Sequence, residues 1–173
     1  MMRSSIGISA PTAKAWVSIL ERSGAIFILH PHYSNIPKRL VKTPKTYFMD
    51  TGHAAYLCRW PNAAILENGA MDGAFLETYV MTEIVKSCFN AGKPADLFYY
   101  RDIDRKEIDL LIVEGDTMYP IEIKKGKEPS KPDKNFDVLA QFKMNVQPGI
   151  ILCMSDELIP YNRQTWYCPI SVL

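Results

Sequence analysis

The chain has 173 residues, of which 47% are hydrophobic and 23% charged, and its formal net charge is +1. These values suit one globular domain of ordinary size or two small ones. A membrane-spanning helix is excluded, because no apolar run in the sequence approaches the roughly 18 residues that such a helix needs. The four cysteines form no CxxC pair, which argues against a structural zinc site. The scattered cysteines are expected to be reduced thiols, and no apolar signal core lies near the start. Both features predict a cytoplasmic protein without a membrane partner.

The net charge hides an asymmetry between the two parts of the chain. Residues 1–60 carry eight Lys or Arg against two acids, whereas residues 61–173 carry twelve against seventeen. A basic segment ahead of an acidic one favours contact with a phosphate backbone in the first part. Ordinary variation over sixty residues is the alternative explanation of this balance.

The first predicted elements are a helix, a strand, a basic loop and a second strand. Ser9 suits a helix N-cap, Pro11 suits the first turn, and Gly24 follows as a C-terminal cap. The residues that recur at helical spacing, and therefore predict a buried stripe, are Ala13, Trp16, Val17 and Leu20. Apolar strands are expected at 25–29 and 46–49.

This order of elements matches the latter half of a winged helix-turn-helix, in which the helix reads DNA and the loop is the wing. We therefore expect a partial winged-helix DNA-binding module over residues 1–58. Its expected phosphate contacts are Lys14, Lys38, Arg39, Lys42 and Lys45. A solvated basic face is the alternative. The earlier helices of the motif are missing, so we expect this chain to be a piece of a longer protein.

The rest of the chain alternates helices and strands. Helices are expected at 50–57, 70–89 and 137–144, and strands at 97–101, 107–113, 118–124, 150–153 and 166–172. The segment 125–134 between them is a polar, lysine-containing loop. This alternation predicts an α/β chain.

Two carboxylates are brought together by the hairpin at residues 107–124. If Gly115 and Asp116 form a two-residue turn, Asp109 lies directly opposite Glu122, and Glu107 lies opposite Lys124. All four side chains then share one face, because strand side chains alternate. Like charges directly opposite one another are destabilising, whereas a divalent cation reverses the sign of that interaction. A simple ion pair between Glu107 and Lys124 explains the lysine but not the opposed acids.

A third carboxylate belongs to the helix at 70–89. When this segment is drawn as a helix, Glu77 falls among the apolar side chains. An unpaired buried carboxylate is costly or becomes neutral. We therefore expect Glu77 to have an internal partner, which could be a lysine, an arginine, a backbone cap or a metal. A slightly rotated helix with Glu77 at its rim is the alternative.

Glu77 on a helix, Asp109 on a strand and Glu122-Ile123-Lys124 on the next strand resemble the PD-(D/E)xK nuclease superfamily. The proline that often precedes the family's Asp is absent here. The resemblance implies a restriction-endonuclease-like mixed sheet flanked by helices over residues 59–173. It also implies that Glu77, Asp109, Glu122 and Lys124 are catalytic, and that the three acids hold Mg²⁺ or Mn²⁺.

A second resemblance covers nearly the whole chain. The segments 42–52, 73–77, 98–102, 107–111 and 120–124 are similar to an uncharacterised C-terminal domain of predicted AAA-superfamily ATPases of bacteria and archaea. In that family an ATPase module precedes a winged helix, and the nuclease-like domain comes last. The resemblance therefore implies an ATPase partner module that this chain lacks.

The function that these features favour is metal-dependent hydrolysis of a DNA phosphodiester. Hard cations bind one or two carboxylates, waters and phosphate oxygens, and the carbonyl of Ile123 is a further candidate ligand. Lys124 would position the attacking water and stabilise negative charge. Weaker candidates for contacting water, phosphate or the DNA backbone are Gln141, Lys125 and Lys127.

Two alternatives lack catalysis. In one, the basic first part binds DNA and the nuclease-like fold is a regulatory platform for the ATPase. In the other, the chain is a protein-interaction domain that never touches nucleic acid, and so shows no salt-sensitive DNA binding.

Overall fold

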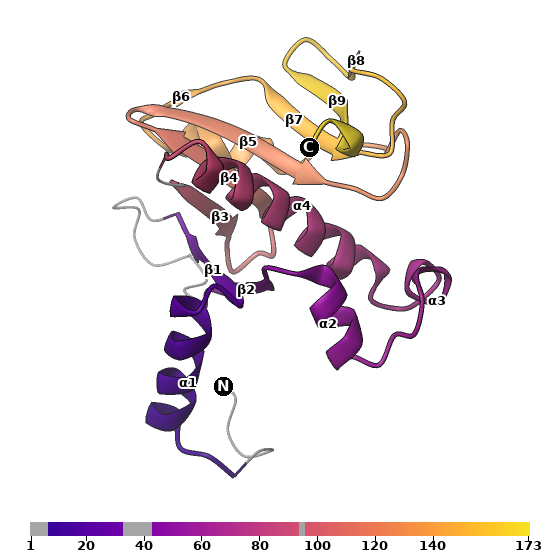
Figure 1. Cartoon of the computed structure of the whole chain (residues 1–173). Coiled ribbons are helices and arrows are strands. Elements are labelled where there is room, and N and C mark those ends of the chain that lie inside the picture. Colours follow the sequence, from indigo (N-terminus) through magenta and orange to yellow (C-terminus); the bar gives the residue numbers. More distant parts are fainter. Residues whose placement is uncertain (1–6, 33–42, 94–95) are drawn as a thin grey trace.

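Figure 1 shows the computed structural model of the chain, which describes residues 7–32, 43–93 and 96–173. The helices are α1 (Ala10–Arg22), α2 (Thr51–Leu57), α3 (Ala63–Glu67) and α4 (Asp72–Asn90), with short 3-10 helices η1 (Phe136–Gln141) and η2 (Ile170–Val172). The strands are β1 (Ile26–Pro31), β2 (Lys45–Phe48), β3 (Leu97–Arg101), β4 (Glu107–Glu114), β5 (Thr117–Ile123), β6 (Asn145–Val146), β7 (Gly149–Cys153), β8 (Ile159–Pro160) and β9 (Thr165–Pro169). The predicted α/β class is confirmed.

All nine of these strands join one mixed sheet. The strand order is β2-β1-β3-β4-β5-β7-β9-β8, and β6 pairs beside β5. The pairs β1–β2, β3–β4, β4–β5 and β8–β9 are antiparallel, whereas β1–β3, β5–β7 and β7–β9 are parallel. Because β1 pairs with β3, the sheet runs across the predicted domain boundary at residue 58. That division stays a prediction.

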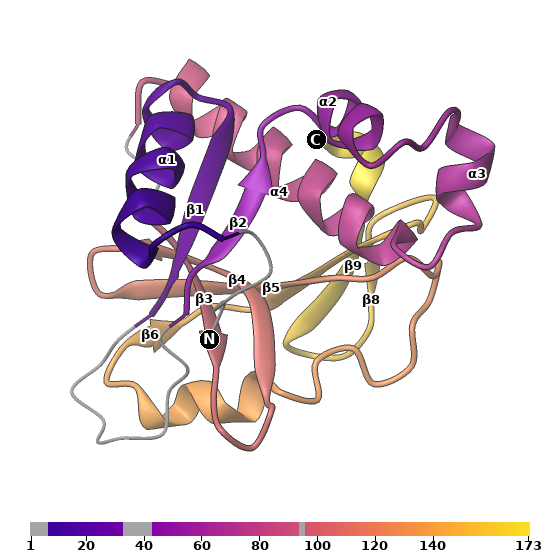
Figure 2. The same cartoon turned by 90° about the horizontal axis from the view of Figure 1, so that it is seen from below.

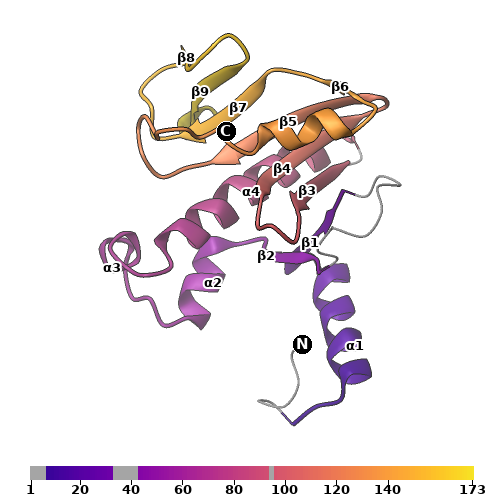
Figure 3. The same cartoon turned by 180° about the vertical axis from the view of Figure 1, so that it is seen from behind.

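Helix α4 crosses one face of the sheet, and η1 lies on the opposite face (Figures 1 and 3). The α4 side holds the larger core, in which Val80, Met81 and Val85 pack with Leu110 and Ile121. A second core lies under η1, formed mainly by Tyr100, Ile108, Leu111, Met118, Leu139 and Phe142. Figure 2 shows β1 and β2 beside β3, with α2 and α3 near the amino end of α4.

Local sequence signals explain where the helices begin. The Ser9 side chain accepts a hydrogen bond from the Thr12 N–H at 3.3 Å, as the N-cap prediction requires. Asp50 caps α2 in the same way through the His53 N–H. The prediction of a long helix at 70–89 is confirmed within two residues by α4. Among the described residues, no helix is long and apolar enough to cross a membrane.

The prediction that α1 has a buried stripe of side chains is wrong. No residue of α1 is buried, and the side chain of Trp16 remains 54% exposed. The helical period is correct, but among the described residues α1 packs mainly against β1 and projects away from the sheet (Figure 1). Periodicity predicts which residues share a face, and the packing partner decides whether that face is covered.

This difference in burial gives a direct stability test. Replacing Trp16→Ala should lower the free energy of unfolding by about 0.5 kcal/mol or less, as for other surface positions. Replacing Leu110→Ala, which is fully buried on β4, should lower it by about 2–5 kcal/mol because a cavity is left. Urea denaturation of both variants measures the two values. Equal losses would show that the face of α1 is covered in solution.

Candidate functional site

The hairpin of β4 and β5 positions the first two carboxylates. Leu110 pairs with Ile121 and Glu114 with Thr117, so the turn consists of Gly115 and Asp116, as predicted. Gly115 has φ of +62°, a backbone conformation that glycine adopts without steric cost. Continuing the observed register by one residue brings Asp109 opposite Glu122.

A β-bulge lies at this point on the other side of β4. Phe98 of β3 pairs with Leu111 and Tyr100 pairs with Ile108, so Tyr99 alone opposes both Asp109 and Leu110. Bulges re-aim side chains and are common beside functional sites. No residue pattern in β3 or β4 predicts this bulge. It alters the simple alternation of faces that was expected for β4.

Lys124 draws together the carboxylates of Asp109 and Glu122. Its Nζ lies 2.6 Å from Glu122 Oε2 and 3.5 Å from Asp109 Oδ2. The Ile123 N–H also donates to Asp109 Oδ2, at 3.0 Å. Glu122 is only 3% exposed. The sequence prediction that the two acids approach one another is confirmed, but the alternative ion pair between Glu107 and Lys124 does not form.

Lys45, at the start of β2, holds a second set of acids. Its Nζ lies 2.9 Å from Glu77 Oε1, 2.5 Å from Glu107 Oε1 and 4.0 Å from Asp109 Oδ1. Tyr47, two residues along the same strand, donates its hydroxyl to Glu77 Oε1 at 2.5 Å. The expected internal partner of Glu77 is therefore a lysine, joined by a tyrosine.

Arg101 extends this network at its far end. Its Nε lies 2.8 Å from Glu107 Oε2, while Lys45 binds the other oxygen of the same carboxylate. Together, β2, α4, β3, β4 and β5 contribute four acids and three cations. We call these seven residues the charge cluster: Lys45, Glu77, Arg101, Glu107, Asp109, Glu122 and Lys124.

The two opposed acids carry different charges near neutral pH. Burial, together with the negative charge of Asp109, raises the pKa of Glu122 to about 8. Burial also acts to raise the pKa of Asp109, but the Lys124 ammonium and the hydrogen bond from Ile123 outweigh it and hold that pKa below its usual value. Of the two opposed carboxyls, Glu122 is therefore the one that favours the protonated form.

The cation and the phenol of β2 are fixed in their usual charge states. Burial disfavours the ammonium of Lys45, but Glu77, Glu107 and Asp109 outweigh burial and raise its pKa above the ordinary value. Burial and the neighbouring Glu77 carboxylate raise the pKa of Tyr47, so its hydroxyl keeps the proton that it donates. Lys45 therefore enters the charge cluster as a permanent cation.

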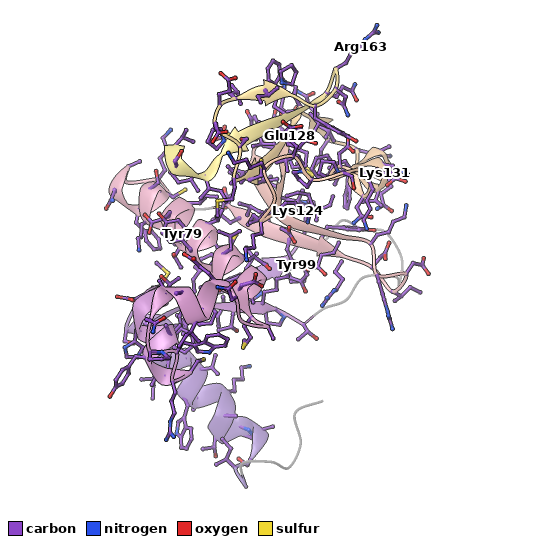
Figure 4. All side chains as sticks on the ribbon, turned by 90° about the vertical axis from the view of Figure 1, so that its right-hand side faces the viewer. Tyr79, Tyr99, Lys124, Glu128, Lys131 and Arg163 are labelled. Carbon is purple, nitrogen blue, oxygen red and sulfur yellow. The ribbon has the colours of Figure 1, made fainter. Side chains whose placement is uncertain are left out.

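A cleft of about 530 Å³ opens beside the paired carboxylates. One side of the cleft is lined by Glu107, Asp109, Glu122 and Lys124. The other side is lined by the loop at residues 129–135. This loop brings Lys131 and Lys134 to the cleft, where both are exposed. Figure 4 shows Lys124 and Lys131 on the same side of the molecule. Sequence reasoning named the loop as polar and lysine-containing but did not select these two lysines.

The other predicted contact residues lie elsewhere. Lys14 is exposed on α1, and Lys38, Arg39 and Lys42 lie outside the described residues.

The weaker candidates near the hairpin have partners of their own. Lys125 pairs with Asp72 at 2.5 Å, and Lys127 pairs with Asp156 at 2.8 Å. Gln141 donates to the Tyr100 hydroxyl at 3.1 Å and does not line the cleft. Lys45 is turned into the charge cluster, with its side chain 19% exposed.

The cluster offers ligands to a metal ion on one side. In the described ranges, no group of three or more His, Cys, Asp or Glu side chains is arranged to hold a metal. Asp109 and Glu122, however, both face the one ammonium of Lys124, so two hard carboxylate ligands already converge on a cation. That donor set suits Mg²⁺ or Mn²⁺, which bind through one or two carboxylates and keep several waters. Glu77 is instead bound by Lys45 and Tyr47.

Comparison with protein families places this chain by its sequence. Residues 72–173, which contain α4 and most of the sheet, match the model of a domain of unknown function, DUF4143, and the chain belongs to that family. Residues 1–64, which contain Lys45, match a second domain of unknown function, DUF8612.

Two curated relatives are similar over 126 residues, or 73% of this chain. They are the uncharacterised protein Rv2008c of Mycobacterium tuberculosis and the uncharacterised protein Mb2031c of Mycobacterium bovis, each 29% identical. The aligned region is 28% of each relative, so this chain spans well under half of their length. No solved structure matches the chain.

The raised pKa of Glu122 predicts how stability depends on pH. Between pH 4.5 and 8 the folded chain keeps a proton that the unfolded chain loses, so this contribution to stability falls as pH rises. Glu122→Gln cannot ionise. Its free energy of unfolding relative to the wild type should therefore rise by about 4 kcal/mol from pH 5 to pH 8.5, at about 1.4 kcal/mol for each pH unit below the raised pKa.

Urea denaturation across this pH range measures the difference. Glu114→Gln, at the exposed end of β4, is the control and should follow the wild type. Parallel curves for Glu122→Gln and the wild type would contradict the shared-proton arrangement.

Proposed function

We propose that the charge cluster is a metal-dependent centre for hydrolysis of DNA phosphodiesters. The observation that carries this proposal is the convergence of Asp109 and Glu122 on the Lys124 ammonium, at 3.5 and 2.6 Å, beside an open cleft. Carboxylates this close are unfavourable without a cation. The resemblance to the PD-(D/E)xK nucleases supports the assignment, because the same three residues form its strand motif.

Each residue has a distinct role in this proposal. Asp109 and Glu122 hold the ion, and Glu122 gives up its proton as the ion binds. A divalent cation there would lower the pKa of its water and offset charge on the phosphate. Lys124 orients the attacking water and stabilises the negative charge that develops. Lys131 and Lys134, across the cleft, contact the phosphates that flank the scissile bond.

We further propose that DNA and an AAA-type ATPase module are the partners of this cytoplasmic domain. The basic first sixty residues support contact with DNA. The curated relatives are much longer than the matched region, which is consistent with a further module in the same protein. The resemblance noted above supports an ATPase as that module.

A second candidate function is a regulatory domain that binds DNA but does not cleave it. The observation that favours it is that Lys45 and Lys124 already neutralise the acids of the charge cluster. Titration calorimetry with Mn²⁺ separates the two candidates. A centre that takes up no Mn²⁺, even with duplex DNA present, favours the regulatory role.

Cleavage of supercoiled plasmid or branched DNA tests the catalytic proposal. With Mg²⁺ or Mn²⁺, Asp109→Asn and Lys124→Gln should each lower the rate by about 100-fold or more, and EDTA should abolish it. Lys86→Gln, which removes an exposed lysine paired with Glu83 on α4, should cleave like the wild type. Equal rates in all four proteins would reveal a contaminating nuclease and end the proposal.

The lysines across the cleft predict a change in salt dependence. Lys131→Gln with Lys134→Gln should reduce the slope of log affinity against log salt by about 2 for a short DNA duplex, because two phosphate contacts are lost. Fluorescence anisotropy in EDTA, which prevents cleavage, measures the slope. Lys86→Gln with Lys93→Gln removes the same charge elsewhere on the surface and should leave the slope unchanged. Salt-insensitive binding by the wild type would favour a protein-interaction domain.

A further inference from the structure

The charge cluster contains two separate cation positions. Lys124 fills one, between Asp109 and Glu122. Lys45 fills the other, among Glu77, Glu107 and Asp109. Asp109 is shared, with Oδ1 toward Lys45 and Oδ2 toward Lys124. A carboxylate that bridges two neighbouring cations is the arrangement that two-metal centres use for a pair of ions.

The two positions differ in how firmly their lysines are held. Lys124 is 38% exposed and borders the cleft, so solvent in the cleft can receive its ammonium if an ion takes over the two carboxylates. Lys45 is 19% exposed, and β1 fixes its backbone through the pairing of Lys45 with Leu29. Its Nζ also lies 5.3 Å from the centre of the Tyr99 ring.

We infer that Lys45 takes the place of a second metal ion, so that the centre binds one divalent cation and not two. This inference rests on the proposed function. A second ion would have to displace a half-buried ammonium that carboxylate oxygens of Glu77 and Glu107 contact at 2.9 and 2.5 Å. With Lys45 in place, the position left for a divalent cation in the described part of the cluster is the one beside Asp109 and Glu122, which Lys124 occupies at the edge of the cleft.

The residue that sets this stoichiometry comes from the first part of the chain. Lys45 lies within residues 1–64, which match one family model, whereas Glu77, Glu107 and Asp109 lie within residues 72–173, which match the other. The amino-terminal segment therefore completes the centre, and β2 is the element that brings the lysine there. Tyr47 of the same strand holds Glu77 in position to receive it.

Counting bound Mn²⁺ by electron paramagnetic resonance tests this inference without any activity assay. The full chain is titrated with Mn²⁺ alone, and again with a phosphorothioate DNA duplex that resists cleavage. The wild type should bind one Mn²⁺ per chain. Lys45→Gln vacates a position lined by three carboxylates and should bind two, with a larger rise in melting temperature on adding Mn²⁺ than the wild type shows. Lys86→Gln, the matched control, should bind one.

Each other outcome overturns a specific claim. Two ions on the wild type, or one ion on both the wild type and Lys45→Gln, would refute the role of Lys45 while leaving the catalytic proposal intact. Binding by Lys45→Gln alone would mean that Lys45 blocks the whole centre, which refutes the one-ion assignment. No Mn²⁺ on either protein, with the duplex present, would refute the proposed function and this inference together. A count of two ions on the wild type refutes the one-ion assignment even if Lys45→Gln does not fold.

Discussion

The alternation of opposite charges through the charge cluster is the constraint that ties the elements of this fold together. Reading from one end, Arg101 holds Glu107, Lys45 joins Glu107 to Glu77 and Asp109, and Lys124 joins Asp109 to Glu122. An isolated carboxylate in this setting would be neutralised or costly to bury. Glu77, Glu107 and Asp109 each take a cation from another element, whereas Glu122 pairs with Lys124 two residues along its own segment. The charge cluster therefore requires that β2, α4, β3, β4 and β5 lie together.

Four acids face three cations in the charge cluster, so its formal charge is −1 when every group is ionised. The raised pKa of Glu122 favours a proton on that carboxyl, which offsets the remaining negative charge. A cation that entered between Asp109 and Glu122 would replace that proton, so ion binding and proton release are coupled. The cluster is therefore complete as a structural network, and Asp109 and Glu122 are the proposed ligands of an ion within it. Both the catalytic and the regulatory role are therefore compatible with its geometry. A count of bound ions distinguishes these two roles more sharply than the fold does.

Sequence reasoning succeeded where the signals were local. Period-two alternation and a glycine turn were enough to set the hairpin register that brings Asp109 near Glu122, and helical spacing located α4. It failed where the outcome depends on distant segments. Lys45 is 32 residues from Glu77, and nothing in either segment indicates that they meet. The bulge opposite Tyr99 arises from pairing between β3 and β4. Lys131 and Lys134 reach the cleft because of the path that the 129–135 loop takes, which their own sequence does not predict.

The placement of Lys45 also changes how the first part of the chain is understood. From the sequence, the basic residues of this part predicted a DNA-binding module separate from the carboxylates of the candidate site. In the structure, β1 pairs with β3, and β2 delivers its lysine to acids of α4 and β4. The two regions therefore share one sheet and one electrostatic network. A shift of β2 relative to α4 would remove the Lys45 ammonium from three carboxylates at once, so the position of the amino-terminal segment and the charge balance of the cluster are coupled.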